Sequence, residues 1–230
     1  MSETAIKTYL NACQFSNQDN ECSICKDVIE EGVTFKHCKH NFHKECLQNW
    51  FTSCKISCPN CNQLYEKIIG IQPKGIMRFN FTKEVLPGYP DACCIEIFFQ
   101  FKDGIQGEEH PNPGKRYHGT TRICYLPGNE MGLKALQPMV DTFIGKSFFT
   151  IGKSVTTGKE NCVIWNGIHC KTRQTGGSAN YGYPDKTYLD RVATECSQKG
   201  YLINPEIKWF KAKYLYLKQE TISNSFQFEI

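Results

Sequence analysis

The stretch Cys22-Ser23-Ile24-Cys25 is followed after twelve residues by Cys38-x-His40-x2-His43-x2-Cys46, and after eleven more by Cys58-Pro59-Asn60-Cys61. These eight thiol and imidazole side chains form four pairs, the number of ligands that two tetrahedral zinc ions require. Two thiolates two residues apart reach one ion at about 2.3 Å, while the turn between them donates backbone N–H groups to sulfur. A disulfide network would leave both histidines unexplained. The spacing therefore predicts a fold held together by two zinc ions.

The composition favours a metal-binding role for the thiols. The chain has 230 residues, of which 40% are hydrophobic, 22% are charged and fourteen are cysteine; apart from the cysteines, this is ordinary for a globular protein. No run approaches the ~18 consecutive apolar residues of a membrane span, so we expect no membrane partner. The first residues, Met1–Lys7, lack the basic and apolar regions of a secretory signal peptide. We therefore expect a cytoplasmic and/or nuclear protein, whose thiols stay reduced and free to bind metal.

Four parts can be distinguished along the chain. Seven of the fourteen cysteines lie between Glu21 and Tyr65. The glycines and the proline within Ile68–Gly75 mark a domain boundary. We expect a polar leader at 1–20, a zinc-binding domain at 21–66, a second domain at 71–201 and a C-terminal extension at 202–230.

The second domain is predicted to mix strands and helices. Alternating or β-branched runs predict strands at 76–82, 93–101, 122–126, 148–151 and 162–165. Helical spacing predicts helices at 129–145, with a kink at Pro138, and from Asp185 to a C-cap at Gly200. Residues 103–114 are expected to form a long loop, and 209–217 is an aromatic-rich stretch of ambiguous type.

The charge is unevenly distributed between the two regions. Residues 67–230 carry a net charge of +6, against −2 for residues 1–66. The second domain is therefore the better host for an anionic partner, but a solvated basic face without a partner is the default interpretation of such an excess.

The cysteine-histidine stretch resembles the RING finger, in the form whose ligands run three cysteines, two histidines and three cysteines. In that family the ligand pairs interleave as a cross-brace, in which each metal closes a loop around the other and replaces a core too small to fold alone. The resemblance implies one zinc on Cys22, Cys25, His43 and Cys46, and a second on Cys38, His40, Cys58 and Cys61.

RING fingers recruit a ubiquitin-conjugating enzyme, the E2, through a shallow apolar groove. The matching positions here are Ile24, Trp50 and Pro59; the alternative interpretation of Trp50, that it merely covers the zinc site, is the less favoured one. Asn62 directly follows the last ligand, where active RING fingers often have Arg or Lys to hold the ubiquitin thioester. Asn donates hydrogen bonds without charge assistance. The resemblance therefore implies E2 docking more directly than strong intrinsic activity.

The second domain carries a series of irregular segments that mark a family. These are Leu86-Pro87-Gly88-Tyr89, Asp103–Gly107 with Glu109–Gly114, Cys124-Tyr125-Leu126-Pro127, Thr156-Thr157-Gly158, Trp165-Asn166, Ile168-His169 and Gly182-Tyr183-Pro184-Asp185. Over residues 71–201 they resemble the C-terminal domain of the Deltex family of RING ubiquitin ligases. The expected fold class is therefore α+β, a zinc-stapled cross-brace RING finger followed by a mixed α+β Deltex C-terminal domain.

The Deltex resemblance implies a pocket for ADP-ribose or NAD. Oxygens of such a ligand suit a hydroxyl-and-glycine turn, which is present at Ser154, Thr156, Thr157 and Gly158. Its bases suit aromatic faces, for which Trp165, Tyr181 and Tyr183 are the candidates. Core packing is the alternative interpretation of each aromatic residue.

His169 and Glu195 fall on positions that resemble the family's functional ones, and we expect them to act as the catalytic pair. A hydrogen-bonded structural histidine and a solvated helix glutamate are the plainer interpretations. Many members have His where this chain has Tyr181, and a second His where it has Cys170.

The resemblance implies a RING-type E3 ubiquitin ligase with E2, ubiquitin and ADP-ribosylated proteins as partners, and a place in Notch signalling. It would direct ubiquitin to ADP-ribosylated substrates, or support ADP-ribosylation of ubiquitin with NAD. The alternative is a catalytically weak, zinc-stabilised reader of ADP-ribose. Nucleic acid is expected only as an ADP-ribosylated substrate, because no Lys/Arg stripe is present.

Overall fold

The computed structural model describes residues 10–14, 20–53, 56–203 and 225–229 of the chain. Two compact units divide at Lys67, the first of which also takes in Gln198–Gly200. Both units combine strands and helices, which confirms the predicted α+β class. No helix of the described residues is long and apolar enough to cross a membrane.

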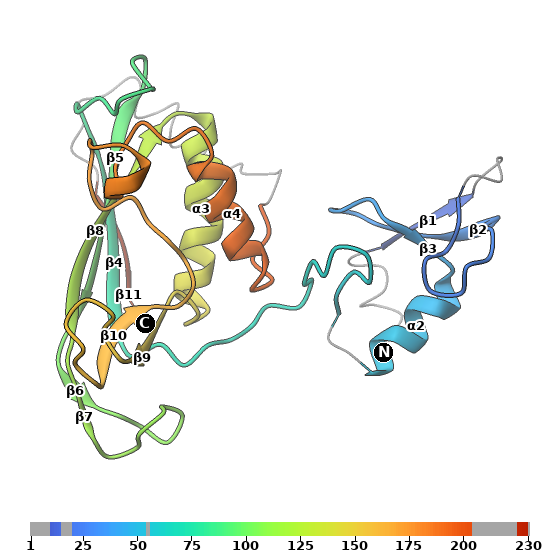
Figure 1. Ribbon diagram of the computed structural model, residues 1–230, viewed down its shortest axis with the longest axis horizontal. Helices are drawn as coiled ribbons and strands as arrows, with labels where there is room; N and C mark the ends of the chain where they lie inside the picture. The colour runs from blue at the N-terminus through green and yellow to red at the C-terminus, as the bar shows by residue number, and fades with distance from the viewer. Residues whose placement is uncertain (1–9, 15–19, 54–55, 204–224, 230) are drawn as a thin grey trace. The chain divides into compact units, whose positions relative to one another are not determined.

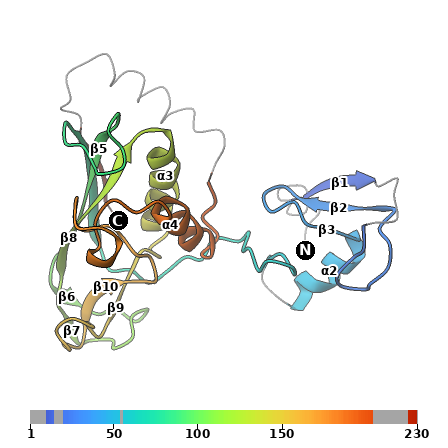
Figure 2. The ribbon, with the colours of Figure 1, turned by 45° about the horizontal axis from the view of Figure 1, so that its top comes forward.

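The first unit is built around a three-stranded antiparallel sheet with the order β1-β2-β3. Its strands are β1 (Leu10–Gln14), β2 (Glu31–Phe35) and β3 (Asn41–Phe42), and the helix α2 (Lys44–Ser53) follows β3. Figure 2 shows α2 alongside this sheet.

Strand β1 lies within the segment that the sequence predicts as a leader. It pairs with β2 from Leu10↔Phe35 to Gln14↔Glu31. The sequence pattern does not show this strand, because Leu10 is buried whereas both Asn11 and Ala12 are exposed. The pairing therefore rests on the backbone ladder rather than on an alternating apolar face.

The core of the first unit is small and aromatic. Phe35 is fully buried and stacks on Tyr65 with ring centroids 4.6 Å apart. The Phe42 ring meets the Phe35 ring edge-on, with centroids 5.9 Å apart, and Leu47 of α2 is buried as well. A core of this size rarely folds without a metal or other cross-link.

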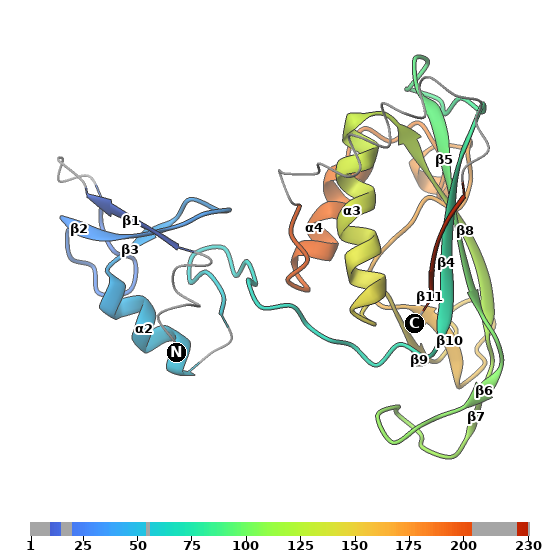
Figure 3. The ribbon, with the colours of Figure 1, turned by 180° about the vertical axis from the view of Figure 1, so that it is seen from behind.

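The second unit contains a four-stranded antiparallel sheet with the order β11-β4-β5-β8. The strands are β4 (Gly75–Thr82), β5 (Cys93–Phe101), β8 (Thr120–Gly128) and β11 (Ser225–Glu229). Figures 1 and 3 show the helices α3 and α4 on one face of this sheet.

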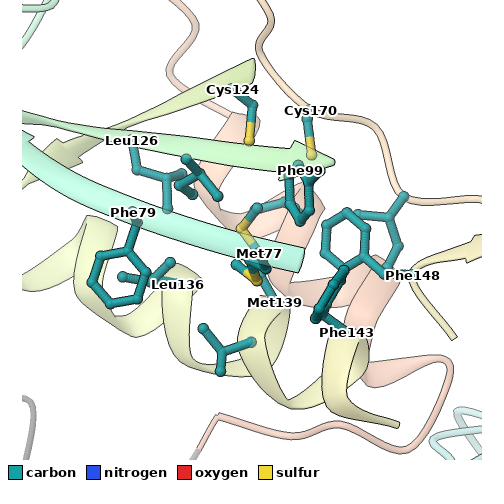
Figure 4. Close-up of a cluster of buried hydrophobic side chains, with 14 of the residues drawn as sticks. Met77, Phe79, Phe99, Cys124, Leu126, Leu136, Met139, Phe143, Phe148 and Cys170 are labelled. Carbon is teal, nitrogen blue, oxygen red and sulfur yellow. The ribbon is translucent and has the colours of Figure 1, made fainter. Parts of the chain in front are cut away.

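The core of the second unit lies between the sheet and α3 (Glu130–Ile144). Alternation along β4 buries Met77 and Phe79, whose side chains face Leu136 and Met139 of the helix (Figure 4). Alternation in a strand places every second side chain on one face, which is why the sequence pattern of β4 and β5 predicts this core well.

Helix α3 begins and ends close to the predicted residues. The Asn129 side chain accepts a hydrogen bond of 3.0 Å from the Gly132 N–H, which satisfies one free donor of the first turn. The helix continues through Pro138, whose carbonyl accepts from Thr142 Oγ1 at 2.6 Å.

Helix α4 (Tyr188–Ser197) starts three residues later than predicted. Asp185, the predicted first residue, uses its side chain to accept from the Thr187 N–H and hydroxyl at 3.2 and 3.0 Å. It therefore caps the turn that leads into the helix instead of forming part of it.

Short elements complete the second unit. Strands β9 (Phe149–Gly152) and β10 (Cys162–Trp165) form one hairpin, close to the predicted ranges. Strands β6 (Gly104–Ile105) and β7 (Arg116–Tyr117) form another around the predicted long loop, and η1 (Ser178–Asn180) is a single turn. The predicted 209–217 stretch lies outside the described residues.

Candidate functional site

The structure brings the eight predicted zinc ligands together in two groups. Within each group all ligand atoms lie within 4.8 Å of one another. Cys25 Sγ lies 3.3 Å from His43 Nδ1 in one group, and Cys58 Sγ lies 3.4 Å from His40 Nδ1 in the other. The groups are those that the RING resemblance implied: Cys22, Cys25, His43 and Cys46, and Cys38, His40, Cys58 and Cys61. Three thiols and one imidazole in each group fit tetrahedral zinc.

The two Cys-x2-Cys turns share one backbone design. The N–H of Lys26 donates to the Cys22 carbonyl at 2.7 Å, and the N–H of Asn62 donates to the Cys58 carbonyl at 2.8 Å. Lys26 and Asn62 have φ angles of 70° and 56°, in the left-handed region. Asn adopts this region more readily than most residues, so the backbone of the turn favours Asn62 at this position.

Local hydrogen bonds prepare the first group for a cation. His43 Nε2 lies 3.2 Å from the Val28 carbonyl oxygen, which can only accept, so the proton sits on Nε2 and Nδ1 is left to bind metal. Burial opposes ionisation of Cys22, but N–H donation from Cys25, His43 and Ile24 lowers its pKa to about 6. Burial and the neighbouring thiols of Cys25 and Cys22 raise the pKa of Cys46 to about 12. A cation among these sulfurs would relieve that repulsion.

Two hydrogen bonds link the segments that carry the predicted E2-docking residues. The Ser23 hydroxyl donates to Asn60 Oδ1, which joins the two Cys-x2-Cys turns. The Trp50 indole N–H donates to the Ser57 carbonyl at 3.2 Å, which fixes the ring beside the second turn. Ile24, next to Ser23, is exposed, whereas Trp50 and Pro59 are half-buried.

His169 and Glu195, the predicted catalytic pair, are in direct contact. Glu195 Oε1 lies 2.8 Å from His169 Nδ1, and Glu195 Oε2 accepts from the His169 backbone N–H at 2.7 Å. The carboxylate is 14% exposed, whereas the imidazole is 72% exposed. One residue of α4 therefore fixes both the backbone and the ring of His169, and the ring edge carrying Nε2 is left to other partners.

Behind this pair, the segment that carries His169 is anchored to both neighbouring elements. Two residues after His169, the Lys171 N–H donates to the Tyr188 hydroxyl of α4 at 3.2 Å, and the Lys171 carbonyl accepts from the Tyr125 N–H of β8 at 3.0 Å. Tyr188 and Glu195 are seven residues apart and so share one face of the helix. The helix thus holds the segment at two points.

A buried ion pair adds a third point of attachment. Lys171 Nζ lies 2.6 Å from Asp185 Oδ2, and both side chains are almost fully buried. Arg191 Nη2 lies 3.0 Å from the same carboxylate oxygen. Although burial alone would raise it, hydrogen bonds from Lys171, Arg191 and Thr187 hold the pKa of Asp185 well below its usual range. The sequence pattern marks Asp185 as the start of a helix and as part of a family segment, but gives no sign of its pairing with Lys171.

The three predicted stacking residues have different surroundings. Tyr181 is 65% exposed, with φ of 57°, and its ring is free to meet a ligand. Trp165 is half-buried and stacks on Phe149 at 4.5 Å, so one of its faces is occupied by the core.

The prediction that Tyr183 stacks on a ligand is wrong. It is fully buried, its hydroxyl donates to the Tyr125 carbonyl at 2.8 Å, and its ring meets Tyr188 edge-on at 5.9 Å. Tyr183 offers no face to a ligand, because the sheet and α4 close over it.

The predicted hydroxyl-and-glycine turn connects β9 to β10. The N–H of Gly158 donates to the Ser154 carbonyl at 2.8 Å, and the Thr157 N–H donates to Ser154 Oγ at 3.3 Å. Gly158 has a φ of 69°, a backbone conformation that would be strained in a residue with a side chain. Thr156, Thr157 and Gly158 are exposed.

Cys170, which directly follows His169, points into the core. It is 7% exposed, and its sulfur contacts that of Cys124 on β8 (Figure 4). Burial, with Cys124 as a further cause, raises the pKa of the Cys170 thiol well above its ordinary value. The Cys170 side chain therefore belongs to the core behind His169 rather than to the exposed side of the site.

Comparison with known proteins identifies both units. Residues 69–201 match the Deltex C-terminal domain, and residues 21–61 match the zinc finger of C3HC4 type, the RING finger. The protein named "Probable E3 ubiquitin-protein ligase DTX3" from Homo sapiens is 42% identical over 186 residues, which cover 80% of this chain and 53% of that protein. "E3 ubiquitin-protein ligase DTX1" from Homo sapiens is 36% identical over 222 residues, covering 86% and 36%, and "E3 ubiquitin-protein ligase DTX4" from Mus musculus is 34% identical over 219 residues, covering 86% and 35%. The chain spans about half the length of the DTX3 relative and about a third of the others. The chain belongs to the Deltex family, with a RING finger followed by the Deltex C-terminal domain.

Proposed function

We propose that this chain is a RING-type E3 ubiquitin ligase that transfers ubiquitin to a hydroxyl of ADP-ribose on ADP-ribosylated proteins. The observation that carries the second half of this proposal is the contact between Glu195 and His169. The relatives named E3 ubiquitin-protein ligases and the two interleaved ligand groups support the first half.

In the first unit, one zinc would join the first Cys-x2-Cys turn to His43 and Cys46, and a second would join the other turn to Cys38 and His40. The face near Ile24, Trp50 and Pro59 docks the E2. A few central apolar and aromatic residues usually dominate such interfaces. The RING finger then acts by orienting the ubiquitin thioester towards the acceptor, and the E3 forms no covalent bond to ubiquitin.

In the second unit, the contact with Glu195 selects one form of His169. A carboxylate only accepts hydrogen bonds, so the proton of the neutral ring lies on Nδ1 and the lone pair on the opposite nitrogen, Nε2. A neutral imidazole with an exposed Nε2 is suited to remove the proton of a ribose hydroxyl as it attacks the thioester carbonyl. Glu195 stabilises the imidazolium that results, and this proton passes to the E2 cysteine thiolate that leaves as the thioester C–S bond breaks.

The ligand would be held by groups from three segments. Tyr181 offers an aromatic face, the outer part of Trp165 offers another, and the exposed hydroxyls of Thr156 and Thr157 suit ribose or phosphate oxygens. A cytoplasmic or nuclear location suits reduced zinc thiolates, and a place in Notch signalling remains a prediction from the family.

ADP-ribosylation of ubiquitin with NAD is a second candidate reaction of the same site. A carboxylate beside the ribose would stabilise the positive charge that develops there. Both oxygens of Glu195 are engaged by His169, so this reaction requires their release. We therefore place ubiquitin transfer first.

Two measurements test the proposal and separate it from a catalytically weak reader of ADP-ribose. Titration calorimetry with ADP-ribose should show one site per chain, and an E2 panel should show ubiquitin discharge that depends on this chain. Binding without discharge by any E2, at full zinc content, would support the reader. No binding of ADP-ribose would refute the role of the second unit.

A further inference from the structure

The two edges of the sheet in the second unit are closed in different ways. The edge of β8 is covered by neighbouring chain, because the Tyr125 N–H donates to the Lys171 carbonyl at 3.0 Å and His118, just before β8, pairs with Cys162. The outer edge of β4 pairs, among the described residues, with β11. Strand β11 lies beyond residue 201, where the match to the Deltex C-terminal domain ends.

The pairing of β11 with β4 is in a defined register. It runs antiparallel from Ser225↔Asn80 to Glu229↔Ile76, beside β4 in Figure 3. The sequence Ser225-Phe226-Gln227-Phe228-Glu229 alternates polar and aromatic residues, the pattern of a strand with one apolar face. The register sets Phe226 opposite Phe79 and Phe228 opposite Met77, and both β4 residues are buried. The alternation of the sequence at 225–229 is therefore in step with the alternation along β4.

Without β11, β4 would be an exposed edge of the kind that recruits other strands. It is eight residues long, alternates regularly, contains no proline, and carries one charged residue, Arg78. Unpaired N–H and C=O groups along such an edge pair readily with another chain. Peptides commonly bind proteins by adding a strand to an edge of this type.

We propose that the outer edge of β4 is a strand-addition site, which the C-terminal segment Ser225–Glu229 of the same chain closes. Because both strands belong to one chain, the pairing is intramolecular, with an effective concentration on the order of millimolar. The segment acts as a cap that keeps the β4 edges of two copies from pairing.

The test uses the full chain with the double substitution Phe226→Pro and Gln227→Pro. Backbone N–H groups of successive strand residues point to opposite sides, so one of the two prolines must remove a donor that faces β4. The matched control is Phe226→Val with Gln227→Thr, which keeps both N–H groups and uses residues favoured in strands. Hydrogen exchange is measured residue by residue along β4.

In the proline variant, exchange should become at least about tenfold faster at every second residue of 76–80, those whose N–H groups face β11. The residues between them face β5 and should keep their protection, as should β5 itself. The control variant should match the unmodified chain. Light scattering should show that the proline variant forms dimers or larger species as its concentration rises.

Three results would overturn the proposal. Unchanged β4 exchange in the proline variant would show that the segment does not close the edge. Protection in the unmodified chain that is lost on dilution would show that the strand comes from a second copy. A proline variant that exchanges quickly but stays monomeric would show that the segment is not a cap against association.

Discussion

Removing either partner of the buried pair Lys171–Asp185 should destabilise the second unit, and the two costs should differ. In Asp185→Asn, Lys171 loses the carboxylate that lies 2.6 Å from its Nζ and keeps an aromatic contact with Tyr188 at 5.6 Å. An ion left buried without its partner costs about 3–5 kcal/mol. In Lys171→Met, Asp185 keeps Arg191 at 3.0 Å and the two donors of Thr187. The remaining partners should limit that cost to about 1–3 kcal/mol.

The cost of Asp185→Asn should also depend on pH. Because the pKa of Asp185 in the folded chain is lowered, its stabilising effect is complete above the pKa of an unfolded Asp, about 3.9. The effect is lost as the pH falls below that value towards the lower pKa of the folded chain. The difference between Asp185→Asn and the unmodified chain should therefore shrink between pH 5 and pH 3.

Native-state hydrogen exchange at β5 is the suitable assay, because it reports unfolding of the second unit alone. Lys171→Met and Asp185→Asn are compared at pH 7, and then across the acid range. If Lys171→Met costs as much as Asp185→Asn, Arg191 and Thr187 do not support the carboxylate as the structure indicates. A difference that stays constant down to pH 3 would contradict the lowered pKa of Asp185.

Further predictions concern the first unit. Cys25→Ser or Cys61→Ser should unfold it while sparing the second unit, since structural zinc contributes about 10–16 kcal/mol in small modules; elemental analysis should give two zinc ions for the unmodified chain, and fewer than one would refute both sites. Trp50→Ala and Ile24→Ala should abolish ubiquitin transfer at unchanged zinc content, and full activity in both would place the docking surface elsewhere. Asn62→Arg should raise ubiquitin transfer through charge-assisted hydrogen bonds. Arg adopts the φ of 56° at this position less readily than Asn, so the same substitution should lower the stability of the first unit by about 1–2 kcal/mol. A melting temperature equal to that of the unmodified chain would contradict this strain.

The sequence predicted those features that depend on spacing or alternation. The positions of the cysteines and histidines predicted two four-ligand groups, because a zinc ion demands fixed ligand numbers, and the structure shows both. Alternation predicted β4, and a β-branched and aromatic run predicted β5, each to within a residue. The contact between His169 and Glu195 was expected only through the family resemblance, because the two residues are 26 positions apart.

Features that depend on tertiary contacts were not predicted. Strand β1 has no alternating pattern, so its pairing with β2 could not be seen in the sequence. Tyr183 and Tyr181 are two residues apart in an irregular segment, and nothing in the sequence separates the buried ring from the exposed one. Lys171 and Asp185 lie fourteen positions apart, and only the fold makes them a pair.

In the proposed reaction, Glu195 acts through His169 on a ribose hydroxyl. The most direct test measures discharge of ubiquitin from a charged E2 to free ADP-ribose and to free lysine, side by side, for Glu195→Ala. Asp190→Asn, which removes an exposed carboxylate from the same helix, is the control. Removing support for a general base should lower transfer to ADP-ribose by about 10²–10⁴-fold, while transfer to lysine and the Asp190→Asn rates stay unchanged. An equal loss of transfer to both acceptors, or no loss of transfer to ADP-ribose, would contradict this role of Glu195.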